Sequence, residues 1–309
     1  MKLMISSLLL FISLAAFAQA DSVFLFSYFK NNGQDGLHLA YSRDGYSFTA
    51  LKNDSSFLHP ELSKDKLMRD PCIIRGADNK FHLVWTVSWT DGGIGYANSP
   101  DLVNWSSQQY LPVMAHESTT LNAWAPEITY DDVKKCYMIY WASTIPGRFP
   151  ATDSSGDGKY NHRMYYTTTK DFTQFTKTSV LYDHGFTVID ATIQKAGDEY
   201  IMFLKDETKL PSPQKNIRIA TGKKLTGNYS QPSTPITGKY WAEGPTAIYT
   251  GKEWIVYFDK YTQHSYGAVT SVDLKNWQDV SDRIKFPQGT RHGTVLKISE
   301  QELAALLKQ

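Results

Sequence analysis

Three short acidic motifs stand out in this chain, and each comes directly before a run of strand-like sequence. The motifs are Arg69-Asp70-Pro71, Ile189-Asp190-Ala191 and Ala242-Glu243-Gly244-Pro245. Convergent carboxyl groups are what hydrolysis of a glycosidic bond requires. In the inverting form of that reaction, one carboxylate activates water, and a protonated acid roughly 6.5–9.5 Å away releases the leaving oxygen. A third carboxylate nearby disfavours ionisation of the acid, because like charges repel.

The three acids can act together only if strands that are distant in the sequence meet in the fold. Short apolar runs bounded by turn residues indicate a chain rich in strands. The clearest runs cover residues 81–85, 137–141, 200–204 and 254–258. The one convincing helix is predicted for residues 300–308, at the C-terminal end.

These runs belong to a repeated unit. Each unit opens with a polar signature and a short apolar strand, continues with a very apolar strand and a third, more polar one, and closes with an Asp/Lys-x-x-x-aromatic turn. The Asp of that turn can cap it through its own side chain. The openings fall at Asp70, Glu127, Asp190, Glu243 and Gly293, which are 57, 63, 53 and 50 residues apart. Repeats of this length with about four strands each are typical of propeller blades.

The repeats predict an all-β fold, a five-bladed β-propeller. Four blades are continuous in sequence, at roughly 70–112, 125–183, 189–238 and 243–285. The fifth combines residues 23–51 with 293–298, so that pairing of the two chain ends closes the ring and removes exposed sheet edges. No linker is apparent, and residues 21–309 are expected to form one domain. The first strand of each blade should line the central axis, so the acidic motifs should face it from the same end.

The order of the motifs resembles glycoside hydrolase family 43, a clan of five-bladed propeller enzymes. The resemblance rests on Arg-Asp-Pro at 69–71, Trp-Ala-Pro-Glu at 124–127, Ile-Asp at 189–190, Glu-Gly-Pro at 243–245 and Arg-His-Gly at 291–293. It covers the chain from about residue 23 to residue 295, with one motif per blade. The Ser-Arg-Asp-Gly turn at 42–45 and the sequence at 122–127 are similar to a subgroup with exo-acting α-L-arabinofuranosidases and β-D-galactofuranosidases.

The resemblance implies a role for each acidic motif. Asp70 matches the general base of the family, Asp190 the carboxylate that tunes the acid, and Glu243 the general acid. Arg291 matches a residue near the tuning carboxylate and the sugar. His292 should lie at the centre of the ring, where some members hold a calcium ion or a water molecule. We expect that no cofactor is required. Whether a structural calcium ion binds near His292 stays open.

Three further residues are candidates for contact with the sugar. Trp124 is expected to form the floor or wall of the pocket, and Trp89 either joins it or packs structurally. Glu127 either touches a sugar hydroxyl or pairs with a basic residue.

The chain departs from the family pattern at Glu127, where others have Asp, and at Ala191-Thr192, where many have Pro-Ser. These departures bear on the substrate more than on the reaction. The stretch 153–158 lacks the bidentate Glu of a calcium loop and is expected to form a surface loop near the site.

Composition narrows the class of protein. With 32 basic and 31 acidic residues, nothing suggests a nucleic-acid partner, because such binding needs clustered positive charge.

Residues 1–20 read as a secretory signal peptide ending in Ala18-Gln19-Ala20, so we expect an exported protein with no membrane span. Cys72 and Cys136 are expected to be buried thiols, with a disulfide as the alternative.

The leading hypothesis is an exported, inverting exo-glycosidase, expected as a monomer, that acts on an oligosaccharide or polysaccharide. It would remove terminal pentofuranosyl-type residues, as an α-L-arabinofuranosidase first and a β-D-galactofuranosidase or β-xylosidase next. The alternative is a non-catalytic carbohydrate-binding propeller. A structural or protein-binding propeller is a third hypothesis, and it leaves the three acids unexplained. The sequence leaves the sugar, the linkage and the compartment open.

Overall fold

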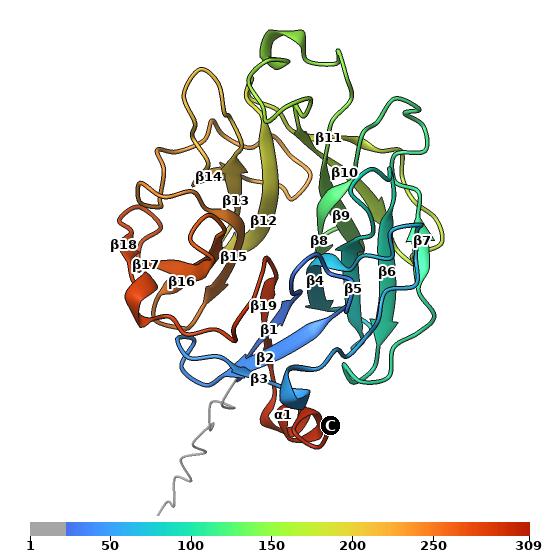
Figure 1. Cartoon of the computed structure of the whole chain (residues 1–309), viewed down its shortest axis with the longest axis vertical. Helices are drawn as coiled ribbons and strands as arrows, with labels where there is room; N and C mark the ends of the chain where they lie inside the picture. The colour runs from blue at the N-terminus through green and yellow to red at the C-terminus, as the bar shows by residue number, and fades with distance from the viewer. Residues whose placement is uncertain (1–22) are drawn as a thin grey trace, which may run out of the picture.

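The computed structural model describes residues 23–309. The signal peptide predicted for residues 1–20 therefore lies outside the described residues. Five β-sheets surround one axis, and the first strand of each sheet lies nearest to it (Figure 1). This arrangement confirms the predicted five-bladed β-propeller. No helix within residues 23–309 has the length and apolar character needed to cross a membrane.

Each blade has one strand at the axis, and its other strands follow outward. In this order, blade one contains β4 (Arg69–Arg75), β5 (Phe81–Thr86), β6 (Ile94–Ser99) and β7 (Gln109–Leu111). Blade two contains β8 (Trp124–Asp131), β9 (Cys136–Ser143), β10 (Arg163–Thr169) and β11 (Ser179–Tyr182). Blade three contains β12 (Val188–Ala196), β13 (Glu199–Asp206) and β14 (Asn216–Gly222). Blade four contains β15 (Glu243–Tyr249), β16 (Trp254–Lys260), β17 (Ser265–Ser271) and β18 (Gln278–Asp279). Blade five contains β19 (Thr294–Ile298), β1 (Val23–Tyr28), β2 (His38–Ser42) and β3 (Thr49–Ala50).

Blade five closes the ring as the sequence predicts. Strand β1 pairs antiparallel with β19, from Val23 opposite Ile298 to Ser27 opposite Thr294. The inner strands also contact one another around the axis, in the order β4, β8, β12, β15, β19 and back to β4. Strands from near both ends of the described chain therefore lie in one sheet, and the inner strands of all five blades surround the axis.

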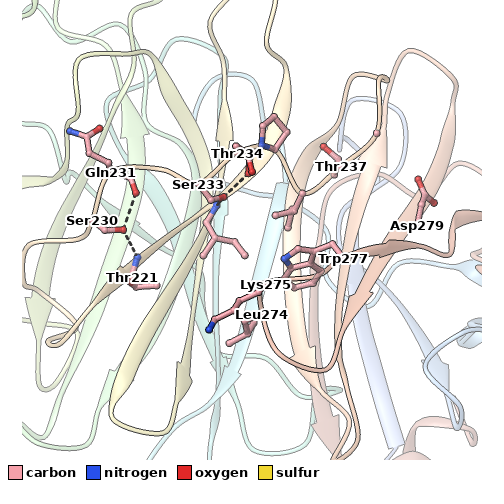
Figure 2. A pocket seen from close by; sticks show the side chains of 14 residues that line it. Thr221, Ser230, Gln231, Ser233, Thr234, Thr237, Leu274, Lys275, Trp277 and Asp279 are labelled. Atoms are coloured by element: carbon pink, nitrogen blue, oxygen red, sulfur yellow. Dashed lines mark hydrogen bonds between the residues drawn. The ribbon is translucent and has the colours of Figure 1, made fainter.

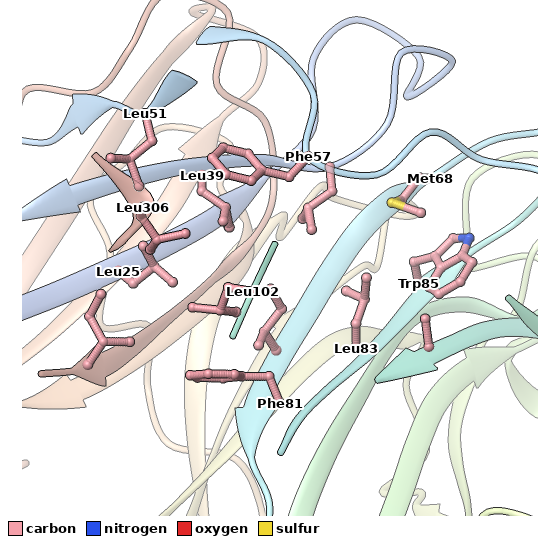
Figure 3. Close-up of a cluster of buried hydrophobic side chains, with 14 of the residues drawn as sticks. Leu25, Leu39, Leu51, Phe57, Met68, Phe81, Leu83, Trp85, Leu102 and Leu306 are labelled. Atoms are coloured by element: carbon pink, nitrogen blue, oxygen red, sulfur yellow. The ribbon is translucent and has the colours of Figure 1, made fainter. Parts of the chain in front are cut away.

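The second strand of each blade is the most apolar because both of its faces are covered. In β5 and β9 every residue is buried, which explains continuous apolar runs in place of alternation. Figure 3 shows the core between blades one and five, where Leu25 and Leu39 meet Leu83 and Trp85. Full burial of each aliphatic side chain of this size contributes about 1.5–3 kcal/mol.

Helix α1 (Glu300–Leu306) confirms the predicted C-terminal helix and adds Leu306 to the same core. It begins with a capping box, in which Ser299 and Glu302 satisfy each other's backbone N–H groups. Three short 3₁₀ turns, η1 (Lys52–Asp54), η2 (Pro150–Thr152) and η3 (Ser281–Arg283), lie in connections. Cys72 and Cys136 are buried free thiols, as expected.

The turns that close the blades confirm the predicted side-chain caps. Asp101 Oδ1 accepts hydrogen bonds from the backbone N–H groups of Val103 at 3.0 Å and Asn104 at 2.7 Å. The same pair of bonds forms at Asp44, Asp171 and Asp273.

Blade three differs from the prediction, because it has three regular strands and not four. The segment after β14 runs beside it, but Pro232 and Pro235 have no N–H to give to a ladder. The N–H groups of β14 find hydroxyl oxygens of this segment as acceptors in place of backbone carbonyls. Backbone N–H groups of β14 donate to Ser230 Oγ at 3.0 Å, Ser233 Oγ at 3.0 Å and Thr237 Oγ1 at 3.2 Å. Figure 2 shows these three residues along the segment that covers the edge.

Candidate active site

A β-bulge at the start of each inner strand builds the site. In β4, Arg69 pairs with Thr86 and Cys72 with Val84, so two residues, Asp70 and Pro71, stand opposite one. The same shift follows Trp124 in β8, Ile189 in β12 and Glu243 in β15. In blade five, the Arg291 N–H donates to the Phe29 carbonyl oxygen and Thr294 pairs with Ser27, so His292 and Gly293 form an equivalent step. Bulges re-aim side chains, and they are common beside active sites.

The bulges define two layers of equivalent positions around the axis. The bulge layer contains Asp70, Ala125, Asp190, Gly244 and His292. The inner ring, two residues further along each strand, contains Cys72, Glu127, Thr192, Thr246 and Thr294. The prediction that the four acids occupy matching points of the repeat is therefore wrong in register. Only Asp70 and Asp190 are equivalent, whereas Glu243 lies one residue before its bulge and Glu127 belongs to the inner ring.

Four of the five bulge positions have a left-handed backbone. The φ angles are 52° at Asp70, 46° at Ala125, 54° at Asp190 and 59° at Gly244, whereas His292 is not left-handed. Asp tolerates this left-handed conformation better than most residues because its short polar side chain can bond locally. Gly244 also lacks room for a side chain, since an added Cβ would lie 2.3 Å from Cγ of His292.

A pocket of about 350 Å³ lies at this end of the axis, a volume within the usual range for ligand sites. Seven of the eight predicted site residues line it: Asp70, Trp89, Trp124, Asp190, Glu243, Arg291 and His292. A larger groove of about 720 Å³ runs along the rim between blades three and four (Figure 2). The charged residues that line the groove are Lys275 and Asp279, so it offers no carboxyl pair. We therefore place the candidate site in the smaller pocket.

Asp70 is held as a carboxylate. Its Oδ2 accepts a hydrogen bond from Thr86 Oγ1 at 2.8 Å, and its Oδ1 lies 3.3 Å from His292 Nδ1. Burial alone would raise the pKa of Asp70, but His292, Arg69 and Thr86 together lower it to about 2. Burial would likewise lower the pKa of His292, but the charges of Asp190, Asp70 and Glu127 raise it to about 9. An imidazolium therefore stands beside an ionised Asp70 at neutral pH.

Asp190 has the opposite electrostatic setting. Its Oδ2 accepts a hydrogen bond from the Gly244 backbone N–H at 3.0 Å. Burial raises the pKa of Asp190 to about 6, and the charges of Glu243 and Asp70 add to the rise while His292 and Lys205 oppose it. Equivalent bulge positions thus give two aspartates with very different proton affinity.

Glu243 lies between two cations. Lys205 Nζ donates to its Oε2 at 3.1 Å and Arg291 Nη2 to its Oε1 at 3.2 Å. Arg291 is itself held by Asp259, whose Oδ2 accepts from Arg291 Nε at 2.6 Å. The Glu243 side chain is 21% exposed, about twice the 11% of Asp70. Glu243 is therefore the more accessible of the two acids to a group entering the pocket.

Two tryptophans form an aromatic wall. Trp89 is 42% exposed, and its ring centre lies 5.4 Å from that of Trp124 at an angle of 87°. The Arg69 guanidinium covers the Trp89 ring at 4.2 Å. Asn32 Oδ1 accepts hydrogen bonds from Trp89 Nε1 at 3.0 Å and Arg69 Nη1 at 3.1 Å, which fixes both. Sugars present apolar C–H faces that such rings can cover.

Sequence reasoning missed five residues of the pocket: Asn31, Asn32, Thr86, Lys205 and Glu207. Asn31 and Asn32 follow β1, and Lys205 and Glu207 follow the apolar part of β13. The signal that could have found them is polar sequence at the end of a buried strand that runs toward the site.

Glu127 does not line this pocket. Its carboxylate accepts hydrogen bonds from Thr192 Oγ1 at 3.0 Å and Thr294 Oγ1 at 3.2 Å, both within the inner ring. Burial raises the pKa of Glu127 to about 7. Glu127 also borders a second depression of about 450 Å³, formed by the later parts of the inner strands at the other end of the axis. The structure thus places Glu127 beneath the site and beside hydroxyls, and no basic residue within 23–309 forms an ion pair with it.

The residues around His292 do not fit a calcium ion. Calcium takes six to eight oxygen ligands, whereas a protonated imidazole offers two N–H donors and a positive charge. Within residues 23–309, no group of three His, Cys, Asp or Glu side chains is arranged to hold a metal.

Comparisons with known proteins agree with the motifs and the fold. A family of probable glycosyl hydrolase domains related to family 43 matches residues 21–304. An α-L-arabinofuranosidase of Bifidobacterium longum subsp. longum is 26% identical over 188 residues. That match covers 53% of this chain but only 17% of the curated relative, so the chain spans a small part of that protein's length.

Solved structures show the same fold. An α-L-arabinofuranosidase of Lactobacillus brevis superposes with a TM-score of 0.51 at 19% identity, over 69% of this chain and 72% of that one. An exo-β-1,3-galactanase of Phanerochaete chrysosporium, solved with β-1,3-galactotriose, gives a TM-score of 0.54 at 14% identity, over 69% of this chain and 49% of that one. The match across nearly all of the described chain, together with the five-bladed fold, shows that this protein belongs to the glycosyl hydrolases related to family 43.

Proposed function

We propose that the protein is an exported, inverting exo-glycosidase that removes single terminal sugars from an oligosaccharide or polysaccharide. The observation that carries the proposal is the meeting of Asp70, Asp190 and Glu243, from three different blades, in one pocket with an aromatic wall. A carbohydrate-binding propeller needs the wall but has no use for an ionised carboxylate and a second, accessible acid.

The proposed mechanism assigns one role to each side chain. Asp70, ionised and oriented by Thr86 and His292, takes a proton from the water that attacks the anomeric carbon. Glu243 gives its proton to the glycosidic oxygen as the bond to the leaving group breaks. Asp190 tunes Glu243 by charge, because a carboxylate nearby disfavours a second negative charge.

The remaining pocket residues are proposed to bind the sugar. Arg291 reaches the pocket beside Glu243 and can donate to a hydroxyl, while Trp89 and Trp124 cover an apolar sugar face. His292 orients Asp70 through the contact between its Nδ1 and Asp70 Oδ1. Glu127 is not proposed as a sugar contact, since both of its oxygens accept hydrogen bonds within the inner ring.

The proposed substrate class is a terminal pentofuranose or related sugar, with α-L-arabinofuranose first. Support comes from the matched relative and one structural neighbour, both named as α-L-arabinofuranosidases. Because another structural neighbour is named as an exo-β-1,3-galactanase, β-galactosyl substrates are also candidates. Export, with cleavage near Ala20, is part of the proposal and rests on the sequence of residues 1–20 alone.

A panel of aryl glycosides tests this function. The panel contains α-L-arabinofuranoside, β-D-galactofuranoside and β-D-xylopyranoside, with proton NMR of the sugar as it is released. We expect turnover of at least one furanoside and first appearance of the anomer opposite to that of the substrate. Retention of the anomer would refute inversion. Binding of arabinan oligosaccharides with no turnover of any glycoside would favour the carbohydrate-binding propeller.

A further inference from the structure

Lys205 stands out because its ammonium group lies inside the protein between two carboxylates, one of which is the candidate acid. Its Nζ donates to Glu243 Oε2 at 3.1 Å and lies 2.7 Å from Glu207 Oε2. The Lys205 side chain is only 4% exposed, so little water screens its charge. A cation this close stabilises the ionised form of a carboxylate, yet a general acid must hold a proton when the reaction begins.

Glu207 is the carboxylate that contributes most to keeping Lys205 charged. Glu207 also pairs with Lys215, and Lys215 lies 3.6 Å from Asp157 in the surface loop of blade two. Asp157 accepts a further hydrogen bond from Lys209 at 2.7 Å. Burial would lower the pKa of Lys205, but Glu207, Glu243 and Asp190 together raise it well above its ordinary value. The charges alternate in sign from Glu207 through Lys215 to Asp157. This arrangement holds the Lys205 side chain in place and keeps it protonated.

Other charges around Glu243 differ from Lys205 in exposure or sign. Arg291 is 31% exposed and shared with Asp259, so water and a second carboxylate weaken its hold on Glu243. The other charged or titratable groups that act on Glu243 come from β4, β12, β16, β17 and the segment after β16: Arg69, Asp190, Asp259, Tyr266 and Tyr261. Lys205 is the most buried cation in contact with Glu243.

We propose that Lys205 is a positioning residue, which sets the pH at which Glu243 takes up the proton that it later donates. The inference rests on the proposed role of Glu243 as the general acid. Glu207 holds Lys205 more closely than Glu243 does, so Glu243 can gain a proton while Lys205 keeps its other partner. The pH range of catalysis is thus determined partly by a strand, β13, that carries none of the three acids.

The test follows the carboxyl carbon of Glu243 directly, in the full chain with glutamate labelled with ¹³C at Cδ. The resonance that disappears in E243Q identifies Glu243. In K205M, we expect the titration midpoint of this resonance to rise by roughly 1–3 pH units, the usual effect of losing a nearby opposite charge. In K205R, which keeps the charge, the midpoint should stay close to that of the natural protein. K209M removes a lysine at the exposed end of the same chain of charges and should leave the midpoint unchanged.

A kinetic measurement gives a second readout. With the aryl glycoside that is turned over, the alkaline limb of kcat/KM should move to higher pH in K205M and not in K209M. If K205M does not fold, K205Q, which keeps a hydrogen-bond donor without the charge, takes its place. An unchanged midpoint in a folded charge-free variant would overturn the inference and leave the proposed function intact. If the natural protein turns over no glycoside, the proposed function fails, and the ¹³C titration still decides the role of Lys205.

Discussion

Asp70 in the bulge layer and Glu127 in the inner ring are both buried carboxyl groups, and their pKa values shift in opposite directions. In the bulge layer, Asp70 contacts the imidazolium of His292, and its pKa falls to about 2 although burial opposes this. In the inner ring, Glu127 contacts the hydroxyls of Thr192 and Thr294, and burial raises its pKa to about 7. The two residues stand only two positions apart in the repeat. A single bulge therefore separates an acid that faces the pocket from an acid that is part of the core.

The difference shows what the bulge does for the proposed chemistry. A regular strand alternates its side chains between two faces, so it cannot present adjacent residues to one pocket. The extra residue in each inner strand lets Glu243 and the neighbouring bulge position, Gly244, both lie beside Asp190. Regular strand pairing begins again at the inner-ring residues, which lie beneath the site on the axis.

The difference between the two layers is tested most directly by making the same carboxylate-to-amide substitution in each layer. D70N removes the proposed base, so we expect kcat to fall by roughly 10²–10⁴-fold, the usual contribution of general acid–base catalysis. E127Q keeps the shape of an inner-ring residue that does not touch the pocket, and its kcat should stay within about a factor of three of the natural value. Steady-state kinetics on the most active aryl glycoside measures both.

Circular dichroism and thermal unfolding of the two variants serve as the control for folding. Equal losses of kcat in folded D70N and folded E127Q would show that the two layers are not functionally distinct. A folded D70N with full activity would remove Asp70 from the proposed mechanism.

The fold was more predictable than the site, and the reason is physical. Apolar runs and Asp-capped turns are local signals, so they locate blades without knowledge of partners. Register at a bulge depends on the facing strand, so the sequence placed Glu127 level with Asp70 when it lies two residues deeper. A shift of this size changes which side chains reach the pocket.

Two other differences have local causes. The fourth strand expected in blade three is absent, and Pro232 and Pro235 were a signal against a regular ladder there. Lys205 follows a buried apolar run, but only the pairing of β13 with β12 brings its ammonium group beside Glu243. No spacing in the sequence carries that information.

The second prediction concerns stability and pH. The folded-state pKa of Glu127, about 7, is above its ordinary value of 4.5, so the folded protein binds more protons than the unfolded chain between these values. Stability therefore falls as pH rises through this window. Replacing Glu127 with Gln removes the effect, and the free energy of unfolding of E127Q relative to the natural protein should increase by about 2–3 kcal/mol between pH 5 and pH 8.

Urea unfolding of both proteins at the two pH values measures this difference. Asp190 is present in both proteins, so it does not account for the difference. The charge of Glu127 is one of those that raise the pKa of His292 to about 9, so the measured difference includes the coupling between these two residues. A constant gap between E127Q and the natural protein would mean that Glu127 does not titrate in this window.

The smallest predicted effect comes from the one bulge position without a side chain. In G244A the new Cβ would lie 2.3 Å from Cγ of His292, and the backbone at φ 59° disfavours any residue with a Cβ. Overpacking of this kind costs about 1–3 kcal/mol, which thermal unfolding would detect. Since His292 holds Asp70, the same variant should also lower kcat, by less than D70N does. Glycine to alanine at Gly197, a turn with open space around it, is the matched control, because its φ of 60° adds the backbone strain without the contact. A G244A protein no less stable than G197A, with unchanged kcat, would show that the bulge layer tolerates movement of His292 and that Asp70 does not depend on it.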